Sequence, residues 1–423
     1  MTQILLKNIK IIDSGSEWHG KIAYVLIKDG LIADISASPI DIKDAEIIDG
    51  ENLFLSRGWV DLRANFCDPG FEYKEDILSG LEAAAYGGFT SVGLLPETDP
   101  ILASKSSIEY VLRKASENIV DLYPLASISS SKENESLTEM FDVHEAGAKG
   151  FSSGYHPVKD SGFLLRAMEY AGMTKLPLMV RPENMSISGK GLMNEGVVSV
   201  RLGLKGIPAI AEEADINTIL HLCEYTGQPI HLSCVSTKGG MESIEKAYKQ
   251  GVKVTADVCI HHLFFDEEDL GMFDTALKMR PPLRTATDKE YLKKAVIEND
   301  FISVVSDHNP QDEDRKQVEF ELAAYGAIGL QTVFSQMIEI FGAEKIDKII
   351  EILTQRPSKV LNIEEQSIKK GSRANLTVFD VSKSWTLNDK FNKSKSKNSP
   401  LWGKELKGKA VAVINKGHFK KLN

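Results

Sequence analysis

Closely spaced cysteines, long hydrophobic runs and an excess of positive charge are all missing from this chain of 423 residues. Its four cysteines lie far apart and no CxxC occurs, which argues against a zinc ribbon or a dithiol redox site. No apolar run approaches the roughly 18 residues that cross a bilayer, and the first residues lack the apolar segment of a signal peptide. We therefore expect a cytoplasmic protein with reduced thiols.

The charge balance narrows the choice of partners. A net charge of −10 argues against binding to nucleic acid or to an acidic membrane. The lysines gather only in a short segment, 393–397, which is too small to act as a binding tail. The length allows one barrel of about 250 residues together with a smaller module.

Short strand patterns rich in isoleucine and valine occur at both ends of the chain. They cover residues 4–12, 23–28, 31–35 and 46–49 near the N-terminus, and 375–380 and 409–415 near the C-terminus. Lys28-Asp-Gly30 has the composition of a hairpin turn. We expect residues 1–55 and 371–423 to fold together as one composite β-module.

Between these ends, apolar strand-like runs alternate with helical patterns. The runs are 58–65, 89–96, 122–129, 148–153, 176–183, 229–236, 253–260 and 301–309, and helical periodicity is clear in 104–116, 160–171, 215–225 and 345–353. Near-continuous apolar runs are typical of parallel strands that are buried on both faces. Eight such units predict an α/β fold, a (β/α)8 TIM barrel over residues 56–370, with its site at the C-terminal strand ends.

Several segments resemble the class I dihydroorotases of the amidohydrolase superfamily. They are spread over nearly the whole chain: 68–76, 83–90, 235–238, 261–263, 281–284, 307–308 and 394–400. The resemblance implies a barrel of the metal-dependent hydrolase type, a small β-sandwich module from both termini, and a place in pyrimidine biosynthesis. It also implies a reaction in which two divalent metals activate a water molecule and an aspartate acts as general base.

This chain departs from the family pattern at most of the reactive positions. The positions that correspond to metal ligands or the base hold Arg63, Asn65, Ser153, Arg181, Cys234 and Asp307, so that only the catalytic Asp307 is retained. The substrate-binding positions hold Cys67, Glu97, Arg280 and Gln311. Two fixed cations would repel a divalent metal, and Glu97 would repel a carboxylate substrate. We expect no bound metal and no hydrolytic activity.

The remaining polar residues have structural interpretations. Asp307 is expected to be a buried ion-pair partner of Arg63 or Arg181. Glu183 and Asp257 lie at strand ends and could pair with nearby arginines. His231, His261 and His262 are interpreted as structural, and Cys234 and Cys259 as small buried residues. Arg63, Arg181 and Arg280 could form an anion pocket, but internal neutralisation is favoured.

Two functional hypotheses follow from the resemblance. The favoured one is a non-catalytic homologue that acts as a partner of aspartate transcarbamoylase, as similar inactive barrels do. The alternative is an active dihydroorotase, or a relative that opens hydantoin- or allantoin-like rings, with an altered zinc centre. A sensor of an anionic metabolite is a third, weaker hypothesis. A homo-oligomer is expected only by analogy with similar barrels.

Overall fold

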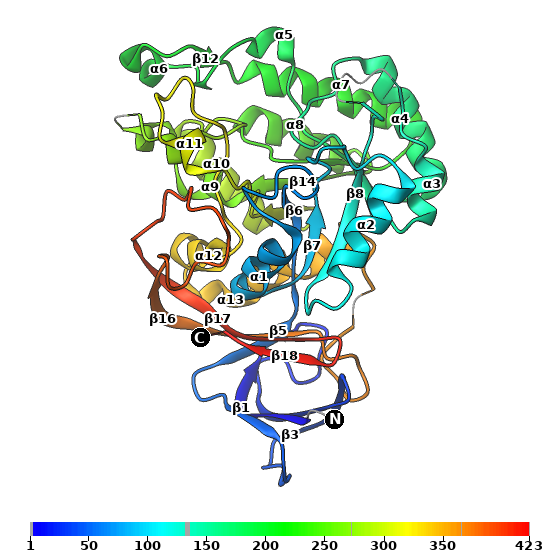
Figure 1. Ribbon diagram of the computed structural model, residues 1–423, viewed down its shortest axis with the longest axis vertical. Helices are drawn as coiled ribbons and strands as arrows, with labels where there is room; N and C mark the ends of the chain where they lie inside the picture. Colours follow the sequence, from blue (N-terminus) through cyan, green and yellow to red (C-terminus); the bar gives the residue numbers. More distant parts are fainter. Residues whose placement is uncertain (1–2, 132–135, 272, 365, 423) are drawn as a thin grey trace.

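The computed structural model describes residues 3–131, 136–271, 273–364 and 366–422. A barrel forms the larger part of the molecule, and a sheet built from both chain ends lies beneath it (Figure 1). The C-terminal ends of the barrel strands point away from this sheet, toward the region of α5, α6 and α7. Among the described residues, none of the helices combines the length and apolar character needed to cross a membrane.

The terminal sheet has eight strands, and its path runs β18-β17-β16-β5-β1-β2-β3, with β4 paired beside β1. The strands are β1 Gln3–Ile11, β2 Ile22–Lys28, β3 Leu31–Ser36, β4 Glu46–Asp49, β5 Phe54–Arg57, β16 Leu376–Thr386, β17 Glu405–Asn415 and β18 His418–Lys421. β5 pairs antiparallel with β16, from Arg57 opposite Leu376 to Phe54 opposite Phe379. This pairing joins the two ends of the chain in one sheet.

A second sheet of eight strands is parallel and forms the barrel, in the order β15-β14-β13-β10-β9-β8-β7-β6. Its strands are β6 Trp59–Ala64, β7 Phe89–Leu94, β8 Asp121–Ser127, β9 Gly150–Ser152, β10 Leu178–Val180, β13 Ile230–Leu232, β14 Val254–Cys259 and β15 Ile302–Val305. A parallel bridge between Ala64 and His308 connects the last strand to the first. The predicted (β/α)8 architecture is confirmed.

Helices surround the barrel and connect its strands. They are α1 Ile77–Gly87, α2 Lys105–Ala115, α3 Met140–Glu145, α4 Ser161–Thr174, α5 Met185–Ser188, α6 Val197–Leu202, α7 Ile210–Thr226, α8 Lys238–Lys249, α9 Ile260–Phe264, α10 Ala286–Glu298, α11 Glu313–Lys316, α12 Val333–Phe341, α13 Ile346–Leu353 and α14 Gln355–Val360. Short 3-10 helices cover Glu267–Leu270, Thr275–Leu277 and Ala343–Lys345. Asp76 and Ser104 start α1 and α2 with capping boxes.

The barrel interior is packed and leaves the strand ends as the place for a site. Side chains from alternating strand positions fill it, among them Leu62, Leu125, Met179 and Val305. An excursion between β10 and α7 adds α5, α6 and the short strands β11 Met193–Asn194 and β12 Gly206–Ile207 above the strand ends. This excursion was not predicted from the sequence.

Candidate functional site

The loops after the barrel strands bring the substituted positions together around one cavity. Three of these positions have a left-handed backbone although none is glycine: Cys67 has a φ of 59°, Cys234 of 56° and Asp307 of 44°. Such conformations are uncommon for these residue types and cluster at active and ligand-binding sites. The backbone therefore has the geometry of a reactive site, and its side chains decide what chemistry is left.

Arg63 and Asp307 form a buried ion pair at the mouth of the barrel. Arg63, at the end of β6, is 1% exposed, and its Nε donates to Asp307 Oδ1 at 2.8 Å. Its Nη2 also donates to the carbonyl oxygen of Gly154 at 3.0 Å. Burial raises the pKa of Asp307 above its ordinary value, and the charge of Arg63 opposes this rise. The predicted ion pair of Asp307 is thus made with Arg63 and not with Arg181.

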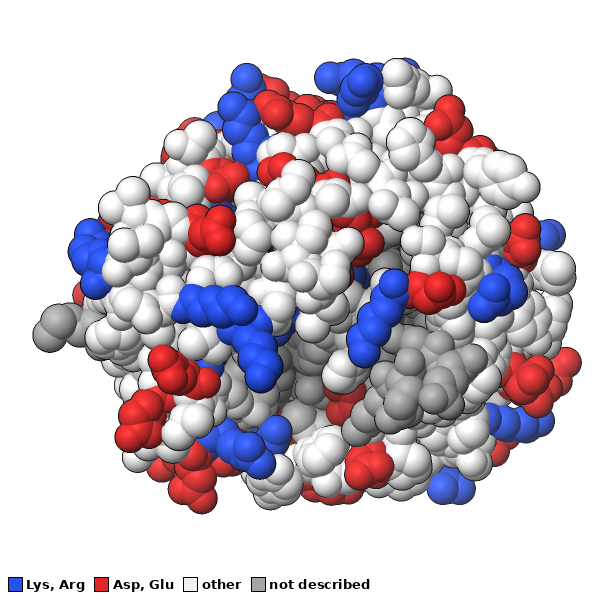
Figure 2. Space-filling view, turned by 90° about the horizontal axis from the view of Figure 1, so that it is seen from above, with Lys and Arg blue, Asp and Glu red and all other residues white. Residues whose placement is uncertain are grey.

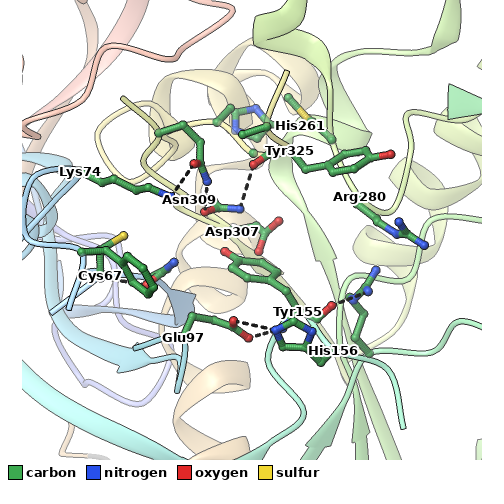
Figure 3. Close-up of a pocket in the computed structure, with 18 of the residues that line it drawn as sticks. Cys67, Lys74, Glu97, Tyr155, His156, His261, Arg280, Asp307, Asn309 and Tyr325 are labelled. Carbon is green, nitrogen blue, oxygen red and sulfur yellow. Dashed lines mark hydrogen bonds and ion pairs between the residues drawn. The ribbon is translucent and has the colours of Figure 1, made fainter. Parts of the chain in front are cut away.

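Tyr155 covers this ion pair from the side of the cavity. The guanidinium of Arg63 lies 4.9 Å from the centre of the Tyr155 ring, within the range of a cation–π contact. Figure 3 shows the ring next to Asp307. Tyr155 lines the cavity, as does Asp307, while Arg63 lies behind them. The guanidinium is held by a carboxylate, a carbonyl and an aromatic face, behind the wall of the cavity.

A second charged cluster consists of Arg181, Glu183 and Arg280. Arg181 Nη1 donates to Glu183 Oε2 at 2.9 Å, and Arg280 Nε donates to the same oxygen at 3.0 Å. Burial opposes ionisation of Glu183, but the hydrogen bond from Arg280 and the charge of Arg181 outweigh it and bring its pKa to about 2. Glu183 pairs with arginines as predicted. Because carboxylates partner Arg63, Arg181 and Arg280, the structure favours internal neutralisation over the three-arginine anion pocket.

The remaining positions of the expected metal shell are used in local hydrogen bonds. Asn65 Oδ1 accepts from the backbone N–H of Cys67 at 2.9 Å, and Ser153 Oγ accepts from that of Arg181 at 3.0 Å. The backbone N–H of Cys234 donates to Asp257 at 2.7 Å. Burial raises the pKa of the Cys234 thiol well above its ordinary value, so the thiol stays protonated at neutral pH.

The prediction for Asp257 was wrong. Among the described residues its carboxylate forms no ion pair with an arginine and contacts His231 Nε2 at 2.8 Å. β13 and β14 run parallel, and His231 lies opposite Thr255. Asp257 is two residues beyond Thr255 in β14, so its side chain is on the same face of the sheet as that of Thr255. His231 also bonds Thr255 Oγ1 at 2.8 Å, which makes it a buried structural histidine, as predicted.

The substrate-binding positions are also occupied by interactions within the protein. Glu97 Oε1 accepts from the backbone N–H of Tyr155 at 2.5 Å, and its Oε2 lies 3.4 Å from His156 Nε2. Burial disfavours the charged form of Glu97, yet the hydrogen bond from His156 outweighs it and lowers the pKa. Gln311 Oε1 accepts from Lys74 Nζ at 3.0 Å. Burial raises the pKa of Cys67 to about 12.

The cavity between these groups has a volume of about 420 Å³. Its polar lining includes Lys74, Glu97, His156, Arg280 and Asp307, and Phe71, Pro157, Met185 and Met279 provide apolar walls. Figure 3 shows Lys74 and Arg280 on opposite sides of Asp307. Seen from above, basic and acidic side chains are interspersed around the mouth instead of forming one patch (Figure 2).

The residues present do not fit a binuclear metal centre. Such a centre needs several neutral imidazoles or carboxylates, whereas two of its positions here hold guanidinium groups. Within the described parts of the chain, no three His, Cys, Asp or Glu side chains are grouped closely enough to hold a metal ion. Asp307, the retained carboxylate, is bonded to Arg63.

Two histidines follow β14 in the short helix α9. His262 Nε2 bonds the carbonyl oxygen of Pro281 at 3.0 Å, consistent with a structural role. His261 lines the cavity, and neither of its buried ring nitrogens has a hydrogen-bond partner among the described residues. Burial lowers the pKa of His261 to about 3, so that it is neutral at physiological pH.

Sequence reasoning missed Lys74, Tyr155 and His156 as parts of this site. Lys74 belongs to a segment that matched the family pattern as a whole, and no local feature distinguished it. Tyr155 and His156 follow β9, and their position directly after a predicted barrel strand was the available signal.

Comparisons with known proteins show a similarity to dihydroorotases in sequence and to hydantoinases in fold. A family model described as dihydro-orotase-like matches residues 53–240. The dihydroorotase of Geobacter sp. (strain M21) is 35% identical over 98% of both chains, and that of Acetivibrio thermocellus is 36% identical over 98% of both. The L-hydantoinase (dihydropyrimidinase) of Arthrobacter aurescens is 22% identical, with a TM-score of 0.86 over 99% of this chain and 96% of its own. A D-hydantoinase structure is 23% identical, with a TM-score of 0.83 over 99% and 95%.

Proposed function

This chain belongs to the dihydroorotase family, and we propose that it is a member that has lost the family's metal-dependent ring hydrolysis and acts as a non-catalytic partner of aspartate transcarbamoylase. The observation that carries the loss of hydrolysis is the Arg63–Asp307 pair. The family's base position is bonded to a guanidinium 2.8 Å away, at the position of a metal ligand.

The electrostatics of the site support this proposal. A bridging water becomes a nucleophile at neutral pH because metal charge lowers its pKa. A guanidinium has no open coordination position and keeps its protons, so it cannot activate water in this way. Asp307, bonded to Arg63, then lacks an activated water from which to take a proton.

The test is ring opening of dihydroorotate by the purified chain, with and without added zinc. The dihydroorotase of Acetivibrio thermocellus serves as the positive control under the same conditions. We expect no turnover above the uncatalysed rate in either condition. Turnover that increases with zinc would refute the proposed loss of hydrolysis.

The proposed partnership needs its own test, because the contact surface is not identified. The support is the resemblance to inactive barrels that assemble with the transcarbamoylase, together with a complete barrel frame whose site is internally neutralised. Purified chain and the transcarbamoylase of the same organism should co-migrate in size-exclusion chromatography, and the chain should change the activity of that enzyme. Separate migration with unchanged activity would exclude the partnership.

The second candidate is a ring hydrolase with a rearranged centre. It is favoured by the open cavity of about 420 Å³ and by Asp307, which lines that cavity and whose pKa is raised by burial. A carboxyl with a raised pKa can serve as a general base nearer to neutral pH. The same turnover assay, extended to hydantoin and allantoin, separates this candidate from the first.

A further inference from the structure

We propose that a second cavity, at the N-terminal end of the barrel, binds an organic acid with an apolar chain and holds its carboxylate at Arg356. This cavity has a volume of about 460 Å³ and lies at the starts of the barrel strands, whereas the mouth lies at their ends. Of the described residues, none lines both cavities. Binding at this end of the barrel goes beyond the proposed function and does not depend on it.

The starts of four neighbouring barrel strands form the apolar part of the lining. Leu178, Ile230 and Val254 are the first residues of β10, β13 and β14, and Phe301 directly precedes β15. Tyr248, near the end of α8, stacks on Phe301 with 4.0 Å between the ring centres. These strand starts and the stacked rings suit the hydrocarbon part of a ligand.

Arg356 of α14 adds a cation to the lining, and only part of its guanidinium is used within the protein. Nη1 donates to the carbonyl oxygens of Val296 and Ile302 at 2.6 and 2.7 Å, and Nε donates to Glu351 Oε1 at 3.1 Å. These bonds hold the guanidinium in place before a ligand arrives. Nη2 is buried and has no hydrogen-bond partner among the described residues. Because an unpaired buried donor is unfavourable, a ligand that supplies an acceptor to Nη2 gains affinity.

The other polar groups of the lining do not select a ligand in this way. His231 already bonds Thr255 Oγ1 and Asp257 Oδ2, both at 2.8 Å. The exposed charged side chains of the lining are Lys175, Lys253, Asp300 and Lys359. Since these are cations mixed with a carboxylate, and Glu351 lies behind Arg356, the position of the acid group is decided by the unpaired Nη2 and not by net charge.

The shape and chemistry of the cavity together define the ligand class. One unpaired donor nitrogen calls for one acid group, so a monocarboxylate fits better than a polyanion. The apolar lining continues on both sides of the strand starts with Leu176, Pro177, Pro229 and Val360. A volume of about 460 Å³ is within the range of small-molecule sites and accommodates a chain of several carbons.

The experiment is calorimetric titration of the full chain with octanoate, octanamide and acetate. Octanamide has the chain without the charge, and acetate has the charge without the chain. We expect octanoate to bind at least about tenfold more tightly than either, because a hydrogen bond between charged groups and the burial of the chain both contribute.

Two variants locate the binding in this cavity. Arg356→Gln removes the charge and should weaken octanoate binding by about tenfold or more. Because Arg356 also bonds the backbone of two neighbouring elements, this variant is used only if its circular dichroism matches that of the unmodified chain. Tyr248→Ser changes a side chain that is 40% exposed and therefore keeps the fold. It should weaken octanoate binding by about fivefold through loss of the aromatic contact.

The matched controls are Lys74→Gln and Tyr73→Ser at the barrel mouth, outside the lining of this cavity. Both should bind octanoate as the unmodified chain does. The inference is wrong if octanoate does not bind, if octanamide binds equally well, or if Tyr248→Ser keeps full affinity. It is also wrong if Lys74→Gln is the variant that loses binding, since the acid then occupies the mouth. None of these results alters the dihydroorotate turnover assay, so failure here is distinguishable from failure of the proposed function.

Discussion

Replacing Arg63 by Met tests whether the buried ion pair holds the mouth of the barrel together. The variant keeps a long apolar side chain but leaves Asp307 without its partner. Arg63 is 1% exposed and the Asp307 side chain 13%, so solvent can compensate little. At a charge separation of about 4 Å and an effective dielectric of about 20, the lost attraction is about 4 kcal/mol. Removing one partner of a buried pair costs about 3–5 kcal/mol. We expect a loss of about 3–4 kcal/mol in the free energy of unfolding.

The pH dependence of this loss has a definite sign. Burial raises the pKa of Asp307, and the charge of Arg63 opposes this rise. In Arg63→Met that charge is absent, so the pKa of Asp307 should rise further. A carboxyl with a raised folded-state pKa destabilises the protein as pH rises through that pKa. The loss in the free energy of unfolding of Arg63→Met should therefore be smaller at about pH 5 than at about pH 8.

The assay is denaturant unfolding followed by circular dichroism, with two further variants. Arg201→Met removes the exposed partner of Glu268 and should cost less than about 1 kcal/mol. Asp307→Asn in the Arg63→Met background removes the unpaired charge and should recover about half of the loss. A loss below about 1 kcal/mol in Arg63→Met, without pH dependence, would refute the reasoning.

Three further variants, two in the site and one at the buried Lys316 of α11, are tested by unfolding measurements. Glu183→Gln leaves the buried Arg181 and the partly buried Arg280 without this carboxylate and should cost about 3–5 kcal/mol, and a neutral result would show that the cluster is solvated. Burial lowers the pKa of Lys316 to about 7, so stability should rise from about pH 7 to about pH 10, and Lys316→Met should lack that rise. Gly154 has a φ of 58°, and an added Cβ would lie 1.9 Å from Glu97 Oε1. Gly154→Ala should therefore cost about 1–3 kcal/mol, and an unchanged melting curve would contradict the tight packing.

Much of the barrel could be predicted because its strands are buried on both faces and read as apolar runs. The boundaries were less accurate where a strand runs into the site. The run 176–183 contains only the short strand β10, Leu178–Val180, because Arg181 and Glu183 turn into the charged cluster. The excursion with α5 and α6 was missed because its elements are only 4 and 6 residues long and have little periodicity.

The candidate site could be predicted by position but not by pairing. The resemblance located Arg63 and Asp307, which are 244 residues apart, at neighbouring strand ends. It left open which arginine Asp307 would contact, since that depends on side-chain packing. The Tyr155 ring over Arg63 and the contact of Lys74 with Gln311 are properties of loop conformation, and no local sequence pattern specifies them.

The most direct test of the central claim is the metal content of the purified chain after incubation with zinc and removal of the excess. If guanidinium groups fill the strand-end site, bound zinc should remain well below one ion per chain, and Arg63→Met should not raise it to the level of a complete centre. About two zinc ions per chain in the unmodified protein, lost on replacement of Asp307, would contradict the account.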